Sequence, residues 1–551
     1  MTSETKICQN CHGSFTIEPD DFGFYQRLDL PAPFRCPKCE WQYLLAFWIF
    51  GRFRISVSAL SGKRIITALP ESVPFPIYER DEFVSDAWDP LSYGRDHDPR
   101  RPFLTRLLEL QASVPHPHQT GIKNVNCDWT DDVWESRDAY LTRSGLGMES
   151  VSYCYRAFYC KNSIDLTYCF NTEHSYDCLH CFNGYGLKYS FNCRACINSA
   201  FLYDCRNCTD CFMCWNLRNK QYHILNQPYS KEDYLVKIKE FDVRSYAVVE
   251  QLRKEFWEHI RNDATHRADY NFLNSRSTGN FLTEDKNCHK CYFLDKSENC
   301  RYCFRGLGSK DNIYIMGSVG EKCGRGSLDQ WGYENVCNLY TSYCRYSAYL
   351  DNCEECEHCF GCVGLRKRSY CVLNKQYSKE QYEELVLHIK SQMKATNEWG
   401  LFFPLAGAYS GYNYSLAHLM FPKFREEALA FGAKWDELPH DGHVGVRSED
   451  LPDRIDGVQD ELTKQRIICA ATKLSYNIAP HELQFYREHG VPLPREHFDW
   501  RTFKRFKPLA LMVDLQREEC VYCGKEIEHY YSPELGFRKV ACVECYQQNF
   551  S

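Results

Sequence analysis

The sequence lacks an apolar run long enough to cross a membrane. Its longest apolar stretch, "YLLAFWIF" at residues 43–50, is well under the roughly 18 residues that a span needs. Its first residues, "MTSETKICQN", lack the basic and apolar regions of a secretory signal peptide. The net charge of −7 argues against a uniformly basic surface coated with nucleic acid, although it permits a local basic patch. We therefore expect a cytoplasmic protein.

The sequence also lacks the common catalytic signatures. It has no phosphate-binding glycine loop, no HExxH and no serine-nucleophile elbow. A catalytic cysteine needs a lowered pKa and a nearby base, and the local sequence singles out no such cysteine. We name no catalytic residue and favour a non-enzyme. A thiol or metal redox protein remains an alternative.

Cysteine, in contrast, is abundant, with 33 residues in a chain of 551. In the reducing cytosol, paired cysteines more often bind metal than form disulfides. Both ends of the chain carry two CxxC knuckles, which together present four thiolates to a tetrahedral zinc ion. Neither set leaves an open coordination position, so we expect structural zinc, two ions per chain. The predicted ligands are Cys8, Cys11, Cys36 and Cys39 at one end and Cys520, Cys523, Cys542 and Cys545 at the other.

Each of these zinc ribbons has a degenerate copy near the other end of the chain. Without a gap, Cys8 of the N-terminal ribbon aligns with Cys469, while Thr472, His497 and Trp500 replace the other three ligands. The C-terminal ribbon aligns with residues 58–83, where serines at 58 and 61 replace the first cysteine pair. The copies are expected to keep their shape by packing rather than by metal.

Two central blocks repeat cysteine at intervals of twelve and of three residues. In "CRNCTDCFMC" and "CEECEHCFGC" every third residue is cysteine, which suits neither an amphipathic helix nor an alternating strand. A fixed short period with turn residues between repeats predicts the stacked coils of a β-solenoid, with small thiols filling a narrow interior. Additional zinc or copper, or an iron–sulfur cluster, is the alternative. Its ligands would be Cys205, Cys208, Cys211, Cys214, Cys353, Cys356, Cys359 and Cys362.

The two blocks end alike, each with a segment that caps the open end. A Ser-Lys-Glu start predicts helices over residues 230–262 and 378–395. The fold expected is mainly β with helical linkers, with ribbons flanking two solenoid-like blocks. The expected order is a ribbon at 1–57, a degenerate ribbon and linker motif at 58–100, a linker at 101–149, solenoid 1 at 150–234, a helical linker at 235–275, solenoid 2 at 276–382, a mixed segment at 383–465, a degenerate ribbon at 466–515 and a ribbon at 516–551.

One cluster of cations suggests a nucleic-acid contact. In "REHFDWRTFKRFK" four cations accompany three aromatic residues, so cations could meet phosphates while rings stack on bases; a solvated basic helix face explains the cluster equally well. The cations are Arg501, Lys504, Arg505 and Lys507. Two weaker metal candidates are "DHD" at residues 96–98 and "HPH" at residues 116–118, which we expect to lie in a loop.

The N-terminal ribbon, the order "WDPLSYGRDHD", "NEWGLFFP" and "YSPELGFRKVACVECY", and the cysteine blocks together resemble a family of uncharacterised zinc-ribbon and cysteine-repeat proteins of candidate-phyla bacteria. The resemblance covers most of the chain. It implies zinc binding and a bacterial origin, but no activity. One departure matters, because the stretch after the first ribbon is usually basic in such proteins. Here it reads "WQYLLAFWIFGRF", which weakens any inherited nucleic-acid role at that end.

The sequence therefore predicts a zinc-binding structural or interaction protein. Zinc modules and solenoids would offer a long surface to a macromolecular partner. The alternatives are a nucleic-acid- or ribosome-binding protein and a redox protein. The partner, whether protein, RNA or DNA, is not named by the sequence.

Overall fold

The structure is a computed structural model that describes residues 2–437 and 444–550. Its contacts divide the chain into two compact units, and each unit combines two separate stretches of sequence. Unit 1 consists of Met1–Gln119 and Asp269–Asp436, and unit 2 of Thr120–Ala268 and Glu437–Ser551. Each unit therefore holds one cysteine-rich block together with the two ribbons from one end of the chain.

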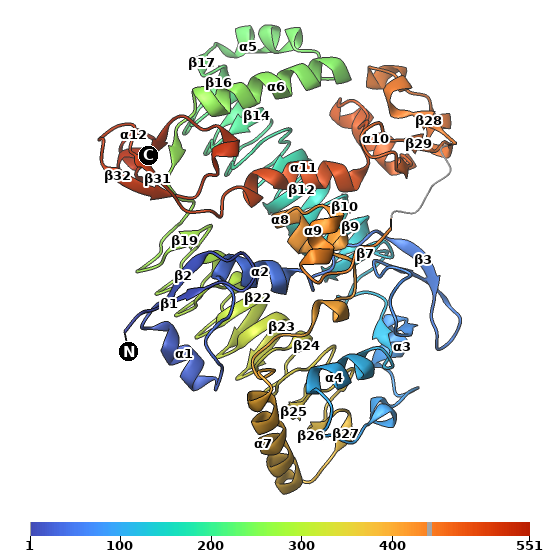
Figure 1. Cartoon of the computed structure of the whole chain (residues 1–551). Coiled ribbons are helices and arrows are strands. Elements are labelled where there is room, and N and C mark those ends of the chain that lie inside the picture. The colour runs from blue at the N-terminus through green and yellow to red at the C-terminus, as the bar shows by residue number, and fades with distance from the viewer. Residues whose placement is uncertain (1, 438–443, 551) are drawn as a thin grey trace. The chain divides into compact units, whose positions relative to one another are not determined.

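In unit 2, the cysteine-rich block forms a parallel ladder, which we call ladder 1 (residues 125–224). Backbone pairing joins residues twelve apart, as between Phe170 and Phe182 and between Phe182 and Arg194. The strands are β7 (Thr130–Trp134), β8 (Arg137–Tyr140), β9 (Thr142–Leu146), β10 (Glu149–Ser152), β11 (Tyr155–Phe158), β12 (Lys161–Phe170), β13 (Tyr176–Leu179), β14 (Ala200–Tyr203), β15 (Thr209–Trp215) and β16 (Gln221–Ile224), closed by the antiparallel β17 (Gln227–Pro228). Figure 1 shows these strands side by side, and in the largest sheet their order is β7-β9-β11-β12-β10-β8.

Unit 1 contains the corresponding ladder 2 (residues 272–372), again with parallel pairing and mostly twelve-residue offsets. Two turns are shorter, with eleven residues: one pairs Phe272 with Thr283, and the other pairs Lys310 with Glu321, beside a register shift between Val319 and Gly320. The strands are β19 (Gly279–Asn280), β20 (Cys291–Asp295), β21 (Phe304–Leu307), β22 (Ile313–Glu321), β23 (Gly324–Tyr333), β24 (Leu339–Ser342), β25 (Glu357–Phe360) and β26 (Ser369–Val372), followed by the antiparallel β27 (Lys375–Gln376).

The ladders turn at every third residue, which explains the period of three. Residues such as Asn192, Ala195, Asn198 and Phe201 all have positive φ. This left-handed conformation costs most residues roughly 1–2 kcal/mol, and Asn, Asp and Gly adopt it most readily. The residue after each turn points inward, and most of these positions hold small or apolar side chains, while Asp329 and Asn335 lie inside ladder 2 and bond each other. The tight corner and the narrow interior therefore select cysteine between turn-forming residues.

The interior thiols also satisfy backbone carbonyls. The Cys193 thiol, for example, donates to the carbonyls of Phe191 at 3.5 Å and Leu202 at 3.4 Å. Each ladder ends on an asparagine at the same place. Asn226 bonds both backbone groups of Trp215, and Asn374 bonds both of Val363. The capped helix that the sequence predicted after each ladder is present, with Ser230 and Ser378 as the N-cap residues.

The pairing of ladder 1 begins earlier than residue 150, where the sequence placed the block. The first bridge joins Val125 to Arg137, and the interior of these first turns holds Thr130, Val133 and Ala139. The start was missed because cysteine is sparse in the early turns, where Cys127 is the only cysteine before Cys154. The remainder of the expected linker at 101–149 contains α4 (Phe103–Gln111).

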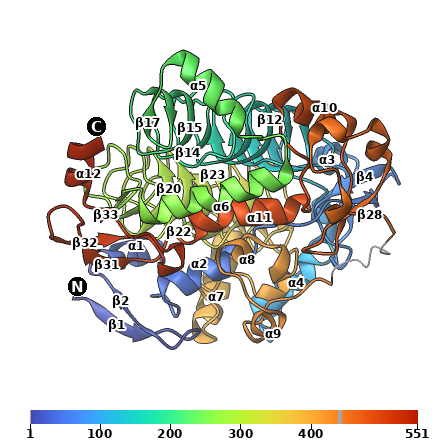
Figure 2. The same ribbon diagram turned by 90° about the horizontal axis from the view of Figure 1, so that it is seen from above.

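Helices and short strands complete unit 1 (Figure 2). The predicted capping helix over 378–395 is confirmed as α7 (Lys379–Ala395), which begins with a capping box at Ser378. The other helices are α1 (Asp21–Arg27), α2 (Pro37–Leu45), α3 (Arg80–Val84), α8 (Leu416–Met420) and α9 (Arg425–Ala430), with the 3-10 helices η1 (Pro90–Tyr93), η3 (Leu405–Gly407) and η4 (Tyr412–Tyr414). The short strands are β1 (Glu4–Ile7), β2 (Ser14–Ile17), β3 (Arg54–Val57), β4 (Arg64–Thr67), β5 (Ile77–Tyr78) and β6 (His116–Pro117).

In unit 2, two helices from distant parts of the sequence lie against ladder 1 (Figure 1). They are α6 (Tyr246–Asn262), next to β14 and β15, and α11 (Phe498–Ala510), next to β12 and β13. The other elements are α5 (Lys231–Lys237), α10 (Pro480–His489), α12 (Val543–Phe550), β18 (His266–Arg267), β28 (Val446–Arg447), β29 (Ile467–Ile468), β30 (Ser475–Tyr476), β31 (Gln516–Glu519), β32 (Glu526–His529), β33 (Val540–Ala541), η2 (Ile238–Glu240), η5 (Ser448–Asp450), η6 (Ile455–Gly457), η7 (Asp460–Lys464) and η8 (Pro533–Leu535).

Candidate metal centres

The N-terminal cysteines converge on one point. Cys8 and Cys11 lie in the turn between β1 and β2, while Cys36 and Cys39 lie at the start of α2. The four sulfur atoms lie within 4.8 Å of one another, and the Sγ atoms of Cys11 and Cys36 are 3.8 Å apart. A tetrahedral zinc ion with Zn–S bonds of about 2.3 Å sets neighbouring sulfurs about 3.8 Å apart. The donor set and its spacing therefore suit zinc.

The C-terminal cysteines form an equivalent group. Cys520 and Cys523 lie in the turn between β31 and β32, Cys542 follows β33 directly, and Cys545 lies in the first turn of α12. Their sulfur atoms also lie within 4.8 Å of one another. Both predicted ligand sets are thus brought together by the same arrangement, a β-hairpin facing the start of a helix.

Backbone amides prepare one thiol of each group to bind a cation. Burial acts to raise the pKa of Cys8, but the N–H groups of Cys11, Cys36 and Asn10 outweigh it and lower the pKa to about 6. Burial is likewise outweighed at Cys520, where the N–H groups of Cys542, Cys523 and Tyr522 lower the pKa to about 6. A zinc ligand must be deprotonated, so these two thiols are available as thiolates at neutral pH.

The N-terminal ribbon is fixed to ladder 2. The buried Arg301 of the ladder pairs with Asp20 and Asp21, at 2.9 Å in each case. The indole Nε1 of Trp41 in α2 donates to the carbonyl of Tyr302 at 2.7 Å. Residues 41–48 of the apolar stretch after the ribbon are buried, so this stretch packs internally. The position of this ribbon therefore depends on contacts with the ladder as well as on its cysteines.

The C-terminal ribbon is fixed to ladder 1 in its own unit. Tyr546 of α12 donates to the Asp204 carboxylate and accepts from Arg218 at 2.6 Å. Strand β33 of the ribbon pairs with β18 in parallel. Ribbon and ladder thus belong to one folded unit although more than two hundred residues separate them along the chain.

The degenerate ribbon of unit 1 keeps the fold and replaces the metal by hydrogen bonds. The N–H of Ser58 donates to the Lys63 carbonyl at 2.8 Å, as that of Cys520 does to Lys525 at 2.9 Å. Glu79 follows β5 directly, as Cys542 follows β33. The hydroxyl of Ser58 donates to the Glu82 carboxylate and accepts from the N–H of Glu79 at 3.3 Å.

Glu79 and Glu82 therefore stand where the C-terminal ribbon has its third and fourth cysteines, together with Ser58 and Ser61 at the first two. Sequence comparison found only the serines, because the loop before Glu79 is one residue shorter than the loop before Cys542. The parallel pairing of β5 with β6, which matches that of β33 with β18, reveals the equivalence.

The degenerate ribbon of unit 2 also keeps its hairpin, β29 with β30. Cys469 accepts a hydrogen bond from the N–H of Thr472 at 3.4 Å. His497, at the start of α11, turns its Nδ1 to the N–H of Asp499 at 3.2 Å. The predicted survival of the ribbon shape without a complete ligand set agrees with this geometry.

The ladder cysteines do not assemble into a further ligand group. Over residues 2–437 and 444–550, only the two terminal sets bring three or more potential ligand atoms within 4.8 Å of one another. The two period-three runs are buried in the ladder interiors. Their inward thiols donate to carbonyls, as Cys205 does to Tyr203 and Cys356 to Glu354. The geometry supports the structural interpretation of Cys205, Cys208, Cys211, Cys214, Cys353, Cys356, Cys359 and Cys362.

The four cations of the predicted basic segment do not share one exposed face. Arg505 is buried, where it bonds Thr167, Asp177 and Asp165, each at 2.9 Å. The side chain of Arg501 is 10% exposed and pairs with Asp165 at 2.9 Å. Lys504 and Lys507 are half exposed and lie near Glu496 and Glu534. Arg501 and Arg505 face inward because they pair with carboxylates of ladder 1 that are remote in sequence.

The two weaker metal candidates are also separated. Asp96 pairs with Lys375, and the Nε2 of His97 contacts Gln392 at 2.8 Å. Asp98 binds the nearby Arg100. The expectation of a loop at "HPH" is wrong, because residues 116–117 form the buried strand β6. His116 stacks on Phe75 and contacts Asp351, so it serves the core.

Comparison with known proteins assigns no family to the chain. No family model and no curated protein matches it. Among solved structures, a chain described as a "putative acetyltransferase" from Desulfovibrio desulfuricans G20 matches with 9% identity and a TM-score of 0.10, covering 48% of this chain and 71% of that one. A likeness this slight carries no argument. Among the helices that the structure describes, none has the length and apolar character needed to cross a bilayer.

Proposed function

We propose that this protein is a zinc-stabilised scaffold that binds a macromolecular partner. The observation that carries the proposal is the pair of closed four-cysteine groups, each in a ribbon that is docked on a ladder in the same unit. Four thiolates leave no open position on the ion, which is typical of structural zinc. We interpret the ladders as β-solenoids and the ribbons as zinc ribbons, so that rigid modules present long surfaces.

We also propose that the chain belongs to the zinc-ribbon and cysteine-repeat family of candidate-phyla bacteria. This proposal is supported by the repeated plan within the chain, in which each unit has an intact ribbon, a degenerate ribbon and a ladder. Such a plan places two similar modules in one polypeptide. The partner we propose is therefore one that offers an extended surface, protein before RNA or DNA.

Zinc removal tests the scaffold. Hydrogen exchange would be compared between the zinc-loaded protein and the same protein after chelation. We expect faster exchange in β1–α2 and β31–α12 and in the ladder turns that they contact, because zinc binding supplies about 10–16 kcal/mol of folding energy in small ribbons. Unchanged exchange in both ribbons after verified zinc loss would contradict the proposal.

Nucleic-acid binding is the second candidate. Its best support is now restricted to Lys504 and Lys507, whose side chains are 51% and 56% exposed. Filter binding to RNA and DNA at two salt concentrations tests it, since each lost phosphate contact lowers the salt dependence by nearly one unit of slope. A Lys504→Gln, Lys507→Gln double variant should then show a flatter dependence. Absence of salt-sensitive binding by the unmodified protein removes this candidate.

The redox alternative finds less support in the ladder thiols. Burial raises the pKa of Cys154 to about 12. Hydrogen bonds from neighbouring thiols lower the pKa of Cys208 and of Cys356, yet both side chains are almost completely buried. A reactive thiol must be reached by its substrate. We therefore assign these thiols to the interior and propose no catalytic residue.

A further inference from the structure

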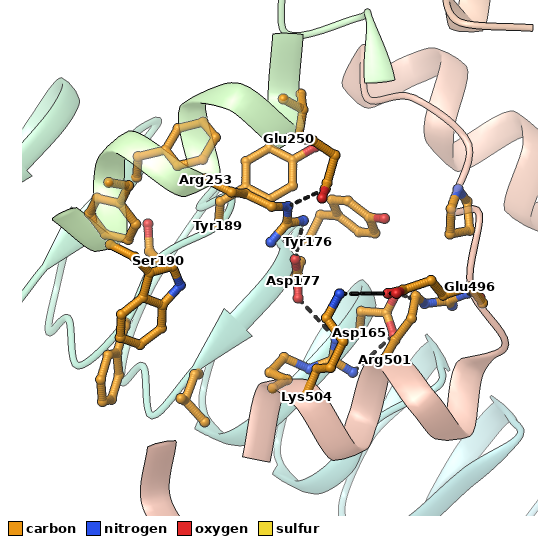
Figure 3. Close-up of a pocket in the computed structure, with 18 of the residues that line it drawn as sticks. Asp165, Tyr176, Asp177, Tyr189, Ser190, Glu250, Arg253, Glu496, Arg501 and Lys504 are labelled. Atoms are coloured by element: carbon orange, nitrogen blue, oxygen red, sulfur yellow. Dashed lines mark hydrogen bonds and ion pairs between the residues drawn. The ribbon is translucent and has the colours of Figure 1, made fainter. Parts of the chain in front are cut away.

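Unit 2 contains a cleft between ladder 1, α6 and α11 that the scaffold function does not use. Its volume is about 440 Å³, within the range of small-molecule sites. Three parts of the chain line it: the ladder around β13, the exposed side of α6, and residues 492–508. Figure 3 shows Asp177 of the ladder pointing toward Arg253 of α6, with Arg501 and Lys504 of α11 beside it.

The cleft carries an excess of positive charge. Seven arginine or lysine side chains and four carboxylates line it, although the whole chain has a net charge of −7. The carboxylates pair with Arg253, Arg501, Arg505 and Lys504. Such a local excess in a partly desolvated cleft favours an anion.

Three of the lining cations lie outside these pairs. Arg495 donates to the carbonyls of Glu449 and Leu451, and Arg261 donates to a third carbonyl, that of Leu535. Lys254 is exposed on α6. No carboxylate of the described chain lies within 4.0 Å of these three, so their charges are not neutralised by ion pairs.

Besides the Nε of Arg253, which lies 3.1 Å from a carboxylate oxygen of Glu250, three polar atoms of the lining residues are shielded from water and have no hydrogen-bond partner in the described part of the chain. They are Nη2 of Arg501, Nε of Arg495 and the hydroxyl of Tyr189. Leaving a buried donor unsatisfied costs roughly 1–3 kcal/mol, and such groups are rare in folded proteins. An anion in the cleft would supply acceptors to all three after small side-chain rotations.

Aromatic rings also line the cleft, beside several aliphatic residues and prolines. Tyr246 and Trp257 of α6 are half-buried, and Trp257 lies near Phe191 of the ladder, with ring centroids 6.2 Å apart. The guanidinium of Arg495 lies 4.3 Å from the centre of the Tyr246 ring. Flat groups pack favourably on such rings. The lining therefore suits a ligand with both an anionic end and a flat apolar body.

The fold itself does not require these arginines. Helix α2 occupies in the N-terminal ribbon the position that α11 occupies in its degenerate copy, and Glu40 and Leu44 stand there in place of Arg501 and Arg505. Leu44 is fully buried, so an apolar residue satisfies the packing at this place. The cationic lining is thus an added feature of unit 2.

We propose that this cleft binds a small organic anion, a phosphate or carboxylate group attached to a flat aromatic body. The anionic end lies toward Lys254, Arg501 and Tyr189, and the aromatic body lies against Tyr246 and Trp257. The site does not depend on the partner of the scaffold, because all of its lining belongs to one unit.

Isothermal titration calorimetry of the full-length, zinc-loaded protein tests the site with four probes. Phenyl phosphate and benzoate carry charge and ring, inorganic phosphate carries charge alone, and benzyl alcohol carries the ring alone. We expect one site per chain and at least about tenfold tighter binding of an aromatic anion than of inorganic phosphate or benzyl alcohol. Preference between phenyl phosphate and benzoate identifies the anionic group. The proposal is overturned if neither phenyl phosphate nor benzoate binds at concentrations up to about 10 mM, which excludes a Kd of roughly millimolar or tighter.

Two variants locate the binding. Tyr189→Phe removes a hydroxyl that has no partner, so it should leave the thermal unfolding temperature unchanged. It should weaken binding of the aromatic anion about tenfold. Lys254→Gln removes an exposed charge and should weaken binding of the aromatic anion about fivefold. The matched control is Lys239→Gln, an exposed lysine of η2 outside the lining. Wild-type affinity in both test variants would place any binding elsewhere and overturn the proposal.

Discussion

The backbone N–H of Glu79 donates to the hydroxyl of Ser58 at 3.3 Å, and the backbone N–H of Cys542 donates to the sulfur of Cys520 at the same distance. The two ribbons therefore share one geometry around different atoms. Where one has thiolates, the other closes with a serine hydroxyl bonded to Glu82. Hydrogen bonds thus hold one ribbon in the geometry that four cysteines have in the other.

We predict two zinc ions per chain, one in each four-cysteine group. In the Cys523→Ser variant we expect one zinc ion and faster exchange around β31–α12, because the lost binding energy is folding energy for that ribbon. Elemental analysis and hydrogen exchange measure both effects. Cys469→Ser is the control and should retain two zinc ions. Four zinc ions in the unmodified protein, or iron with visible absorption, would show that the ladder or the degenerate ribbons bind metal.

We predict that four cysteines restore a third zinc site. The variant combines Ser58→Cys, Ser61→Cys, Glu79→Cys and Glu82→Cys, which occupy the ligand places of the C-terminal ribbon. The hairpin and the helix start are already in position, so the zinc content should rise from two to three. A variant with only the two serine replacements is the control and should stay at two. A folded quadruple variant with two zinc ions would refute the equivalence.

We predict that Asp165→Asn strongly destabilises unit 2. The carboxylate is almost completely buried and pairs with Arg501 and Arg505 at 2.9 Å. Removing it leaves buried cations partly uncompensated, at a cost of about 3–5 kcal/mol. Denaturant unfolding measures the loss. Asp138→Asn, at an exposed ladder corner, should cost less than about 1 kcal/mol, and a similar loss in both variants would contradict the prediction.

The same cluster should resist acid. Burial acts against ionisation of Asp177, but the charges of Arg253 and Arg505 hold its pKa at about 2. A lowered carboxyl pKa stabilises the fold above the ordinary value near 3.8 and loses this contribution as pH falls toward 2. Glu482 behaves in the opposite way and offers the cleaner measurement.

We predict that Glu482→Gln removes a pH dependence of stability. Burial raises the pKa of Glu482 to about 7, and the hydroxyls of Tyr153 and Tyr486 both donate to its carboxylate. A raised carboxyl pKa stabilises the fold below the ordinary value near 4.5, and that stability is lost as pH rises through 7. Between pH 4.5 and 8 the unmodified protein should lose about 2–4 kcal/mol relative to the variant. Parallel pH profiles of the two proteins would contradict this.

We predict that alkylation distinguishes the ribbon thiols from the ladder thiols. All ladder cysteines are buried, whereas Cys11 and Cys523 are exposed. After chelation under native conditions, mass spectrometry should find the eight ribbon thiols modified, since loss of zinc loosens the ribbons that bury Cys8, Cys39, Cys520 and Cys542, and the ladder thiols unmodified until unfolding. Modification of ladder thiols such as Cys208 or Cys356 in the folded protein would revive the redox alternative.

The sequence predicted those features that depend on neighbouring residues. Paired CxxC knuckles identified the ligands because each pair needs only a tight turn. The twelve-residue register and the caps at Asn226 and Asn374 followed from short-range repetition. The first turns of ladder 1 escaped notice because their interior holds a single cysteine, Cys127, beside Thr130, Val133 and Ala139, so the cysteine period does not show there.

What the sequence could not predict depends on remote contacts. Arg501 and Arg505 form a basic cluster in the sequence, and only the position of Asp165 and Asp177 across the unit shows that their charges face inward. The assignment of each pair of ribbons to a ladder is likewise set by packing, since the N-terminal ribbons skip the nearer block and dock on the second.

The two units alternate along the chain, and this alternation has a consequence for biosynthesis. A ribosome that makes the chain from its N-terminus releases ladder 1 long before it reaches α11. Until then Asp165 lacks both Arg501 and Arg505, Asp177 has only Arg253 of α6, and the side of the ladder that α11 later covers is open to water. Unit 1 receives its last residues by Asp436, when the second half of unit 2 is still untranslated. Ribosome-stalled chains in which residue 436 has just left the exit tunnel should therefore contain a folded unit 1 and a ladder 1 that still lacks α11.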